Sequence, residues 1–371
     1  MPKYREVYLE NAKTLVDSGT EIVELSLADP ISELTVKAYA TNGATSNKDA
    51  PIPLIISKLE VVDGANVIYS LDGEMAFALG YYHTKKLPML GIREAEGYVQ
   101  HAEFIISFGR WLWDPMFALI PQKFRNLQLK ITWNLAAVRA VGATGFVTGT
   151  GKLTVIARVM EELKAEPAGY FMHKNHYNFT SAASGEERIP LPTDHPYAAL
   201  MYRAYEAGIN MSTSISNVKL NIDFDKDIPF DLAANDVRNR IAKIYDMCRI
   251  HNIGKGDDAE AHESWLADTF SLQIIPNASG TIVGISSTDA ARYTLAQKLH
   301  DNTAVNGMTR FVEAMGIGPF NCFAIPFGTL EDTETYLDAP GFGDIKFIMT
   351  QGDAGATVDV MLSQLKMYAK A

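Results

Sequence analysis

The second half of this 371-residue sequence repeats, block by block, the pattern of its first half. Such self-similarity identifies the structural unit before any fold is assigned. Five pairs of blocks occur in the same order, namely 19–30 with 185–196, 31–38 with 215–222, 104–109 with 323–328, 124–132 with 342–350, and 154–159 with 357–362. In the third pair, four of six residues agree between Phe-Ile-Ile-Ser-Phe-Gly and Phe-Ala-Ile-Pro-Phe-Gly. One block arises easily by chance, but five colinear blocks indicate a duplicated unit.

The repeated unit is made of short strands. Apolar residues alternate with polar ones along 23–27, 34–38, 127–133 and 153–159, which is the period of half-buried strands. Helical periodicity is confined to 74–82, 232–247 and 291–300. Many spaced strands without strand-helix alternation predict a sandwich or barrel. Each copy has about the length of an eight-stranded jelly roll, so we predict an all-β chain of two tandem eight-stranded jelly rolls with short helical insertions.

Shifts between the paired blocks predict the domain limits. The offset rises from 184 to 219 between the second and third pairs, and we place the extra residues of the second copy in an insertion near 225–262. The strand pattern breaks at Glu166-Pro-Ala-Gly169. The first jelly roll is therefore expected at 19–165 and the second at 166–371.

Residues 1–18 lie before the first repeated block. Tyr4, Tyr8 and Ala12 fall near one face of a helix, with Gly19 as a stop. We predict a short amphipathic helix or arm, packed on its own domain or docked onto a neighbouring subunit or a lipid surface. Acidic residues among the basic ones and the lack of an apolar core argue against a signal peptide.

The charge of the chain limits its partners. A formal charge of −11 and a pI near 5.2 argue against direct nucleic-acid binding, which needs a concentrated basic surface. Cys248 and Cys322 lack the spacing of a disulfide framework or a zinc site, so both are expected as free thiols.

Several segments resemble chemical motifs without meeting their requirements. The loop 145–152 ends in Gly-Lys, but Leu153 follows where a phosphate-binding loop needs Ser or Thr. His173 and His176 are three residues apart and therefore point to opposite faces of a strand, unlike a shared metal site. Asp223, Asp225 and Asp227, or Asp257 and Asp258, remain open as calcium ligands, although the first group lacks the EF-hand glycine and glutamate.

Trp111, Trp113 and Phe117 form the densest aromatic cluster. Aromatic faces stack on sugars, but packing between the jelly rolls or between subunits is the favoured interpretation. The sequence thus predicts no catalytic, cofactor-binding or metal-ligating residue.

With the duplication and the segments 104–110, 124–131, 215–220 and 357–368, the chain resembles the double jelly-roll major capsid proteins of the tectivirus and adenovirus lineage, in particular its bacteriophage members. The resemblance covers roughly residues 19 to 371. It implies a homotrimer whose upright jelly rolls form a pseudo-hexagonal tile of an icosahedral shell, over an internal membrane. It further implies contacts between trimers and with vertex or minor capsid proteins, assembly in the host cytoplasm, and a place in the virion. No enzymatic activity or cofactor is expected.

Two alternatives use the same architecture. A secreted glycan-processing enzyme with paired jelly rolls is one, since fold alone does not fix function. A viral carbohydrate-binding spike is the other.

Overall fold

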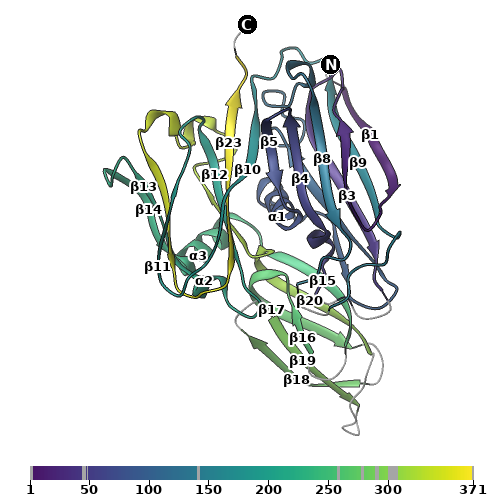
Figure 1. The fold of residues 1–371 in the computed structure, drawn as a ribbon. Coiled ribbons are helices and arrows are strands. Elements are labelled where there is room, and N and C mark those ends of the chain that lie inside the picture. The colour runs from purple at the N-terminus through teal and green to yellow at the C-terminus, as the bar shows by residue number, and fades with distance from the viewer. Residues whose placement is uncertain are drawn as a thin grey trace.

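The chain folds into two lobes that stand side by side, with a smaller group of strands at one end (Figure 1). The computed structural model describes residues 3–43, 47, 49–139, 143–256, 260–276, 280–288, 292–299 and 308–369.

The first lobe is a jelly roll of two four-stranded arrays. One has the order β1 (Lys3–Thr14), β9 (Lys152–Glu161), β3 (Ile31–Thr41) and β7 (Val99–Ser107), and the other has β2 (Ser18–Glu24), β8 (Leu127–Asn134), β4 (Ile56–Asp63) and β5 (Asn66–Leu71). Alternation along each strand builds the core. In β3, Leu34, Val36 and Ala38 are fully buried, whereas Lys37 and Tyr39 on the opposite face are partly exposed.

The second lobe repeats this arrangement. Its arrays have the orders β10 (Gly169–Thr180), β23 (Thr357–Met367), β12 (Tyr197–Tyr205), β21 (Cys322–Pro326), and β11 (Gly185–Pro190), β22 (Ile345–Gln351), β13 (Ile215–Ile222), β14 (Asp227–Ala233). Strand order along the chain and across the sheets is the same in both lobes. The prediction of two tandem eight-stranded jelly rolls is confirmed.

Strand register tests the repeated blocks residue by residue. Val36 lies opposite Phe104 in the first lobe and Tyr202 lies opposite Phe323 in the second, so the block at 104–109 is matched to 323–328 as predicted. The blocks starting at 19 and 124 also align as predicted, because Val23 faces Leu129 where Ile189 faces Phe347.

Two block pairs need correction. Residues 31–38 belong to β3, which corresponds to β12, whereas 215–222 form β13, which corresponds to β4. Alternating apolar residues match any strand of the same fold, so this pairing was misled by the shared period. In the last pair, β9 and β23 correspond at an offset of 205 rather than 203, a shift of two residues that preserves the alternation.

The extra strands of the second lobe lie further along the chain than predicted. The offset is 159 between β4 and β13 and 219 between β7 and β21, so the added residues fall between β14 and β21. They form β15 (Cys248–Gly256), β16 (Glu260–Glu263), β17 (Leu266–Pro276), β18 (Gly280–Thr288), β19 (Arg292–Leu299) and β20 (Met308–Pro319). The insertion predicted at 225–262 is therefore wrong over β14 and the helix after it, which belong to the repeated unit. The helical pattern at 291–300 is also wrong, since 292–299 form β19.

Each jelly roll carries a helix in the same place. The helix α1 (Gly73–Thr84) follows β5, and α3 (Ala234–Ile244) follows β14, in agreement with the helical patterns predicted there. A single turn, α2 (Met211–Ser214), precedes β13, and the short strand β6 (Leu90–Arg93) joins β7 to β15. Among the described residues, no helix has the length and apolar character needed to cross a membrane.

The helix predicted for residues 1–18 is wrong, because residues 3–14 form β1, paired antiparallel with β9. Tyr4, Tyr8 and Ala12 are spaced by four, which fits a strand as well as a helix. Val7 and Leu9 pack against the core, while Tyr4 and Tyr8 are more than half exposed. The segment is thus the first strand of the first jelly roll.

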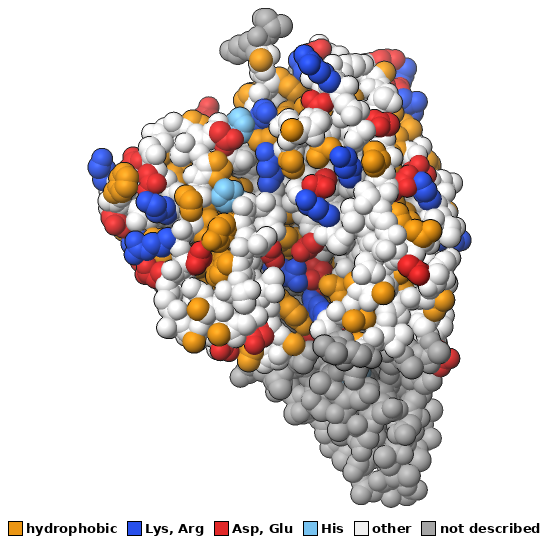
Figure 2. All heavy atoms as spheres, in the orientation of Figure 1, with side chains coloured by type: hydrophobic (Ala, Val, Ile, Leu, Met, Phe, Trp, Pro, Cys, Tyr) orange, Lys and Arg blue, Asp and Glu red, His pale blue; other side chains and the backbone are white. Residues whose placement is uncertain are grey.

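Acidic and basic side chains are interspersed over the face of both lobes seen in Figure 2. This mixture, with a net charge of −11, is typical of a soluble surface.

Candidate functional site

The two jelly rolls meet in a joint, defined here as α1 and β5 of the first jelly roll against β10, β12, β21 and β23 of the second. At its edge β5 runs parallel to β10, with Tyr69 opposite His173 and Ser70 opposite Lys174. This pairing makes one eight-stranded sheet from four strands of each jelly roll. The joint is therefore part of the fold.

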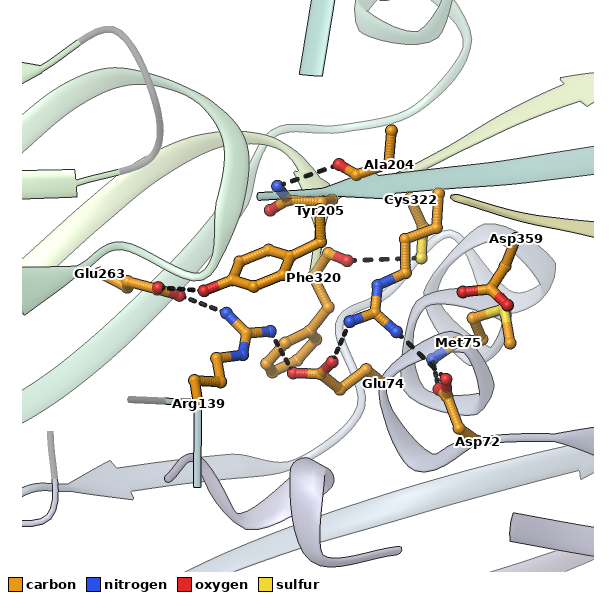
Figure 3. Close-up of polar contacts among 12 residues, drawn as sticks. Asp72, Glu74, Met75, Arg139, Ala204, Tyr205, Glu263, Phe320, Cys322 and Asp359 are labelled. Carbon is orange, nitrogen blue, oxygen red and sulfur yellow. Dashed lines mark hydrogen bonds and ion pairs between the residues drawn. The ribbon is translucent and has the colours of Figure 1, made fainter. Parts of the chain in front are cut away.

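A buried ionic network crosses the joint (Figure 3). Glu74, in the first turn of α1, accepts hydrogen bonds from Arg203 of β12 at 2.5 Å and from Arg139 of the first jelly roll. Arg139 also donates to Glu263 of β16, and Arg203 donates to Asp72 at 3.1 Å. One carboxylate thus connects the two jelly rolls, and Arg139 extends the connection to the inserted strands.

Local structure fixes the acidic side chains of this network. Asp72 is the N-cap of α1, and its Oδ1 accepts a hydrogen bond from the Met75 N–H at 2.8 Å. The cap fixes the residue at which the helix begins. The start of the helix in turn directs the Glu74 side chain toward β12 across the joint. Glu263 accepts a further hydrogen bond from the Tyr205 hydroxyl at 2.5 Å.

The charges of the network depend on each other. Burial alone would lower the pKa of Arg203, but Glu74 and Asp72 outweigh it and raise that pKa above its ordinary value. Arg139 follows the same pattern, with Glu74 and Glu263 opposing burial. Burial raises the pKa of Asp72 to about 6 although Arg203 opposes the shift. Both guanidinium groups are thus held charged inside the joint.

Two histidines pack against each other in another part of the joint. His83 of α1 packs edge-on against Phe171 and His173 of β10, with ring centroids 6.3 and 6.2 Å away. Burial lowers the pKa of His83 to about 4 and that of His173 to about 3, and in His173 the neighbouring His83 adds to the effect. Both rings are neutral at pH 7.

We expect the joint to weaken in acid. Both histidines have a folded pKa below 6.5, so between pH 6.5 and about 4 the unfolded chain binds more protons than the folded chain. Each histidine then removes about 1.4 kcal/mol of stability per pH unit as the pH falls through this window. Asp72, with its raised pKa, acts in the opposite direction between about pH 4 and 6 and offsets one histidine. The urea concentration at the midpoint of unfolding should therefore fall between pH 6 and pH 4. In His173→Gln this fall should be smaller. If the variant has the same pH profile as the natural chain, the lowered pKa of His173 does not contribute to the loss of stability.

An apolar pocket completes the joint. Its volume is about 130 Å³, and α1, the end of α3 and the outer faces of β12, β21 and β23 line it, with Leu79, Tyr82, Ala199, Met201, Ala324 and Met361 among the lining residues. The Tyr82 hydroxyl donates to the Cys322 carbonyl at 2.6 Å. The outer face of the second jelly roll is thus covered by a helix of the first.

Comparison with known proteins identifies the fold of the chain through its similarity to solved structures. No protein-family model matches the chain, and no curated protein matches its sequence. Among solved structures, the major capsid protein P2 from Bacteriophage PM2 is similar at 11% identity and a TM-score of 0.54, over 99% of each chain. The STIV MCP is similar at 10% identity and a TM-score of 0.58, over 98% of this chain and 97% of the other. The atomic structure of Sulfolobus Turreted Icosahedral Virus matches at 10% identity and a TM-score of 0.61, over 98% and 91%.

The chain has the double jelly-roll fold of these major capsid proteins. The match extends over nearly the whole of both chains, so it includes the duplication and the placement of the two jelly rolls. At these identities the similarity shows the fold alone, and no residue role is carried over from it.

The double jelly roll separates the histidines considered as metal ligands. His173 is buried in the joint, whereas His176 is exposed and its Nε2 lies 2.8 Å from the Pro190 carbonyl. Within the described part of the chain, no group of three His, Cys, Asp or Glu side chains is arranged to hold a metal ion.

The aspartates considered for calcium take part in a turn. Asp223 accepts backbone hydrogen bonds from Gly343 and Asp344 at 2.8 and 3.0 Å, and Asp225 pairs with Lys219. Asp257 and Asp258 lie outside the described residues. In the loop 145–152, Lys152 begins a strand, so no helix N-terminus follows to bind phosphate.

The aromatic cluster is divided between the joint and the surface. Phe117 packs edge-on against Phe171 across the two jelly rolls, at 6.0 Å between ring centroids. Trp113 stacks on Tyr4 at 4.8 Å, and Trp111 is 44% exposed. Packing between the jelly rolls is confirmed for Phe117. Cys248 and Cys322 are free and buried, as expected.

The sequence alone did not identify the ionic network. Glu74, Arg139 and Arg203 lie far apart in the chain, and no motif connects them. The available signal was Arg203 itself, a charge within the apolar strand Ala-Ala-Leu-Met-Tyr-Arg-Ala-Tyr.

Proposed function

We propose that this protein is a viral major capsid protein that forms a homotrimeric, pseudo-hexagonal tile of an icosahedral shell. The observation that carries the proposal is the pair of jelly rolls standing side by side in one chain, in the fold shared with major capsid proteins. Three copies supply six similar units, the number that fills a hexagonal outline.

The arrangement along the long axis supports an upright tile. The start of β1 and the end of β23 lie at one end of the molecule, and β16, β18 and β19 lie at the other (Figure 1). In this proposal the inserted strands form the outward projection and the end with the termini faces the interior. We also propose the domain boundary at 165–169, in the connection between β9 and β10.

The partners follow from the same proposal. The chain binds itself within trimers and between trimers, and its inner end faces an internal membrane and minor or vertex proteins. The net charge of −11 favours a shell that does not touch nucleic acid directly. The role is structural and non-enzymatic, and its place is the virion.

Light scattering coupled to size-exclusion chromatography tests the proposal. We expect a particle with three times the 40.8 kDa mass of one chain, together with larger assemblies at higher concentration. A chain that stays monomeric at all concentrations would contradict a capsid role. Sedimentation velocity on the same sample provides an independent mass.

A further inference from the structure

We propose that α3 and β14 of one copy pack against β1, β3, β7 and β9 of the next copy, so that the joint inside the chain is repeated between chains. This inference rests on the proposed function, because it specifies which surfaces the copies use. The occupant of both surfaces is a second copy of this chain.

The repeat makes the two sides equivalent. The strands before the two helices are equivalent, because Val61 lies opposite Tyr69 in the first jelly roll and Leu220 lies opposite Phe230 in the second. The helix α1 begins four residues after Tyr69, and α3 begins four residues after Phe230. On the receiving side, β1, β9, β3 and β7 correspond to β10, β23, β12 and β21. Inside the chain, α1 and β5 cover this second group, so the corresponding donor for the first group is α3 with β14.

Each of the two surfaces ends, among the described residues, in a strand edge that has no partner in the same chain. In the described sheets, β1 and β14 are terminal strands, whereas their counterparts β10 and β5 pair with each other. Figure 1 places β14 and β1 on opposite outer sides of the molecule. A contact that uses two different surfaces is heterologous and closes into a ring when the rotation permits, as a trimer requires.

Register identifies an apolar pair in the proposed contact. Phe171 lies opposite Leu365 where Tyr4 lies opposite Met160, so Tyr4 is the counterpart of Phe171. By its place in the helix, Ile244 is the counterpart of His83, which packs against Phe171. Tyr4 is 54% exposed and Ile244 is 41% exposed. Two exposed apolar side chains thus occupy the positions that touch inside the joint.

A charged pair lies beside it. Lys243 is the counterpart of Tyr82, whose hydroxyl binds the Cys322 carbonyl, and Glu103 is the counterpart of Cys322. Lys243 is exposed, and Glu103 sits on the outer face of β7, where it pairs with Lys37 at 2.8 Å. Opposite charges therefore occur on the two surfaces at matched positions, which favours correct pairing of copies.

The buried network is not repeated. Asp72 and Glu74 have Ala233 and Asn235 as counterparts, and Arg203 has Lys37. A buried ionic network needs all its partners in place, because an unpaired charge is costly once it is removed from water. Surfaces that face water before assembly do not meet this condition. The contact between copies is therefore held by exposed apolar side chains and by charged side chains at the rim. Such a contact suits an interface that forms after the chain has folded.

Site-directed cross-linking tests the inference on the full chain. Tyr4→Cys and Ile244→Cys are made as separate variants, mixed under assembly conditions and oxidised. We expect interchain dimers only in the mixture, and cross-linked trimers when one chain carries both substitutions. Because Cys248 and Cys322 are buried, each single variant alone should stay uncross-linked.

A matched control pairs Ile244→Cys with Val16→Cys, which is 65% exposed but lies beyond the other end of β1 from Tyr4. We expect at least tenfold less cross-linked product from it. If light scattering shows trimers and the Tyr4 and Ile244 variants do not cross-link above this control, the inference is wrong while the proposed function stands. If the chain is monomeric, both are overturned.

Discussion

Replacing Glu74 with Gln should lower the local stability of the joint by about 3 kcal/mol. The side chain is 2% exposed and binds two guanidinium groups, and the substitution leaves both with less compensation inside the protein. Removing one partner of a buried ion pair typically costs about 3–5 kcal/mol, since an uncompensated charge remains. Asp72 and Glu263 still compensate part of the charge of the two guanidinium groups. The expected loss of stability is therefore at the lower end of this range.

Hydrogen exchange measures this effect where it arises. Amides of α1 and β12 should exchange about a hundredfold faster or more in Glu74→Gln, while the cores of both jelly rolls change less. Lys58→Met, which breaks an exposed pair with Glu60, should stay within about 0.5 kcal/mol. A second variant that combines Asp72→Asn, Glu74→Leu, Arg139→Met, Arg203→Met and Glu263→Gln should be more stable than Glu74→Gln, because all the charges of the network are removed together. Equal exchange in Glu74→Gln and the natural chain would contradict the role given to this network.

Lys243→Glu should weaken self-association by about tenfold or more. In the proposed contact the substitution sets a carboxylate against Glu103 of the next copy, and like charges at an interface are costly. A tenfold change corresponds to about 1.4 kcal/mol. The measurement is the concentration at which trimers dissociate, followed by sedimentation velocity.

The charge swap separates contact from misfolding. Adding Glu103→Lys to Lys243→Glu restores opposite charges and should recover most of the association, whereas Glu103→Lys alone should also weaken it. Lys58→Glu changes the net charge equally at an exposed position of β4 and should leave association within about twofold. If the double variant associates no better than either single variant, the two residues do not face each other.

Much of the fold was predictable because alternation and repetition are local signals. The block containing Phe104 aligned with that containing Phe323, and the strands around them were placed correctly. The same signal failed for residues 31–38, because alternating strands of one fold resemble each other. It failed for Tyr4 and Tyr8 because a spacing of four fits both a helix and a strand.

The contacts across the joint could not be predicted from the sequence, for a different reason. Glu74 and Arg203 are separated by 129 residues, and they meet only because β5 and β10 pair across the two jelly rolls. Phe117 was an exception, since its place in an aromatic cluster suggested packing between the units. Contacts that depend on the relative placement of two domains leave little trace in local periodicity.

In the function proposed above, three copies of this chain form a tile of six similar jelly rolls. Electron microscopy of the purified assembly tests it most directly, through averaged views down the symmetry axis. We expect a particle with threefold symmetry and a six-lobed, near-hexagonal outline, with one projection per chain from the inserted strands. A monomer, or an assembly whose averages show a twofold outline, would contradict it.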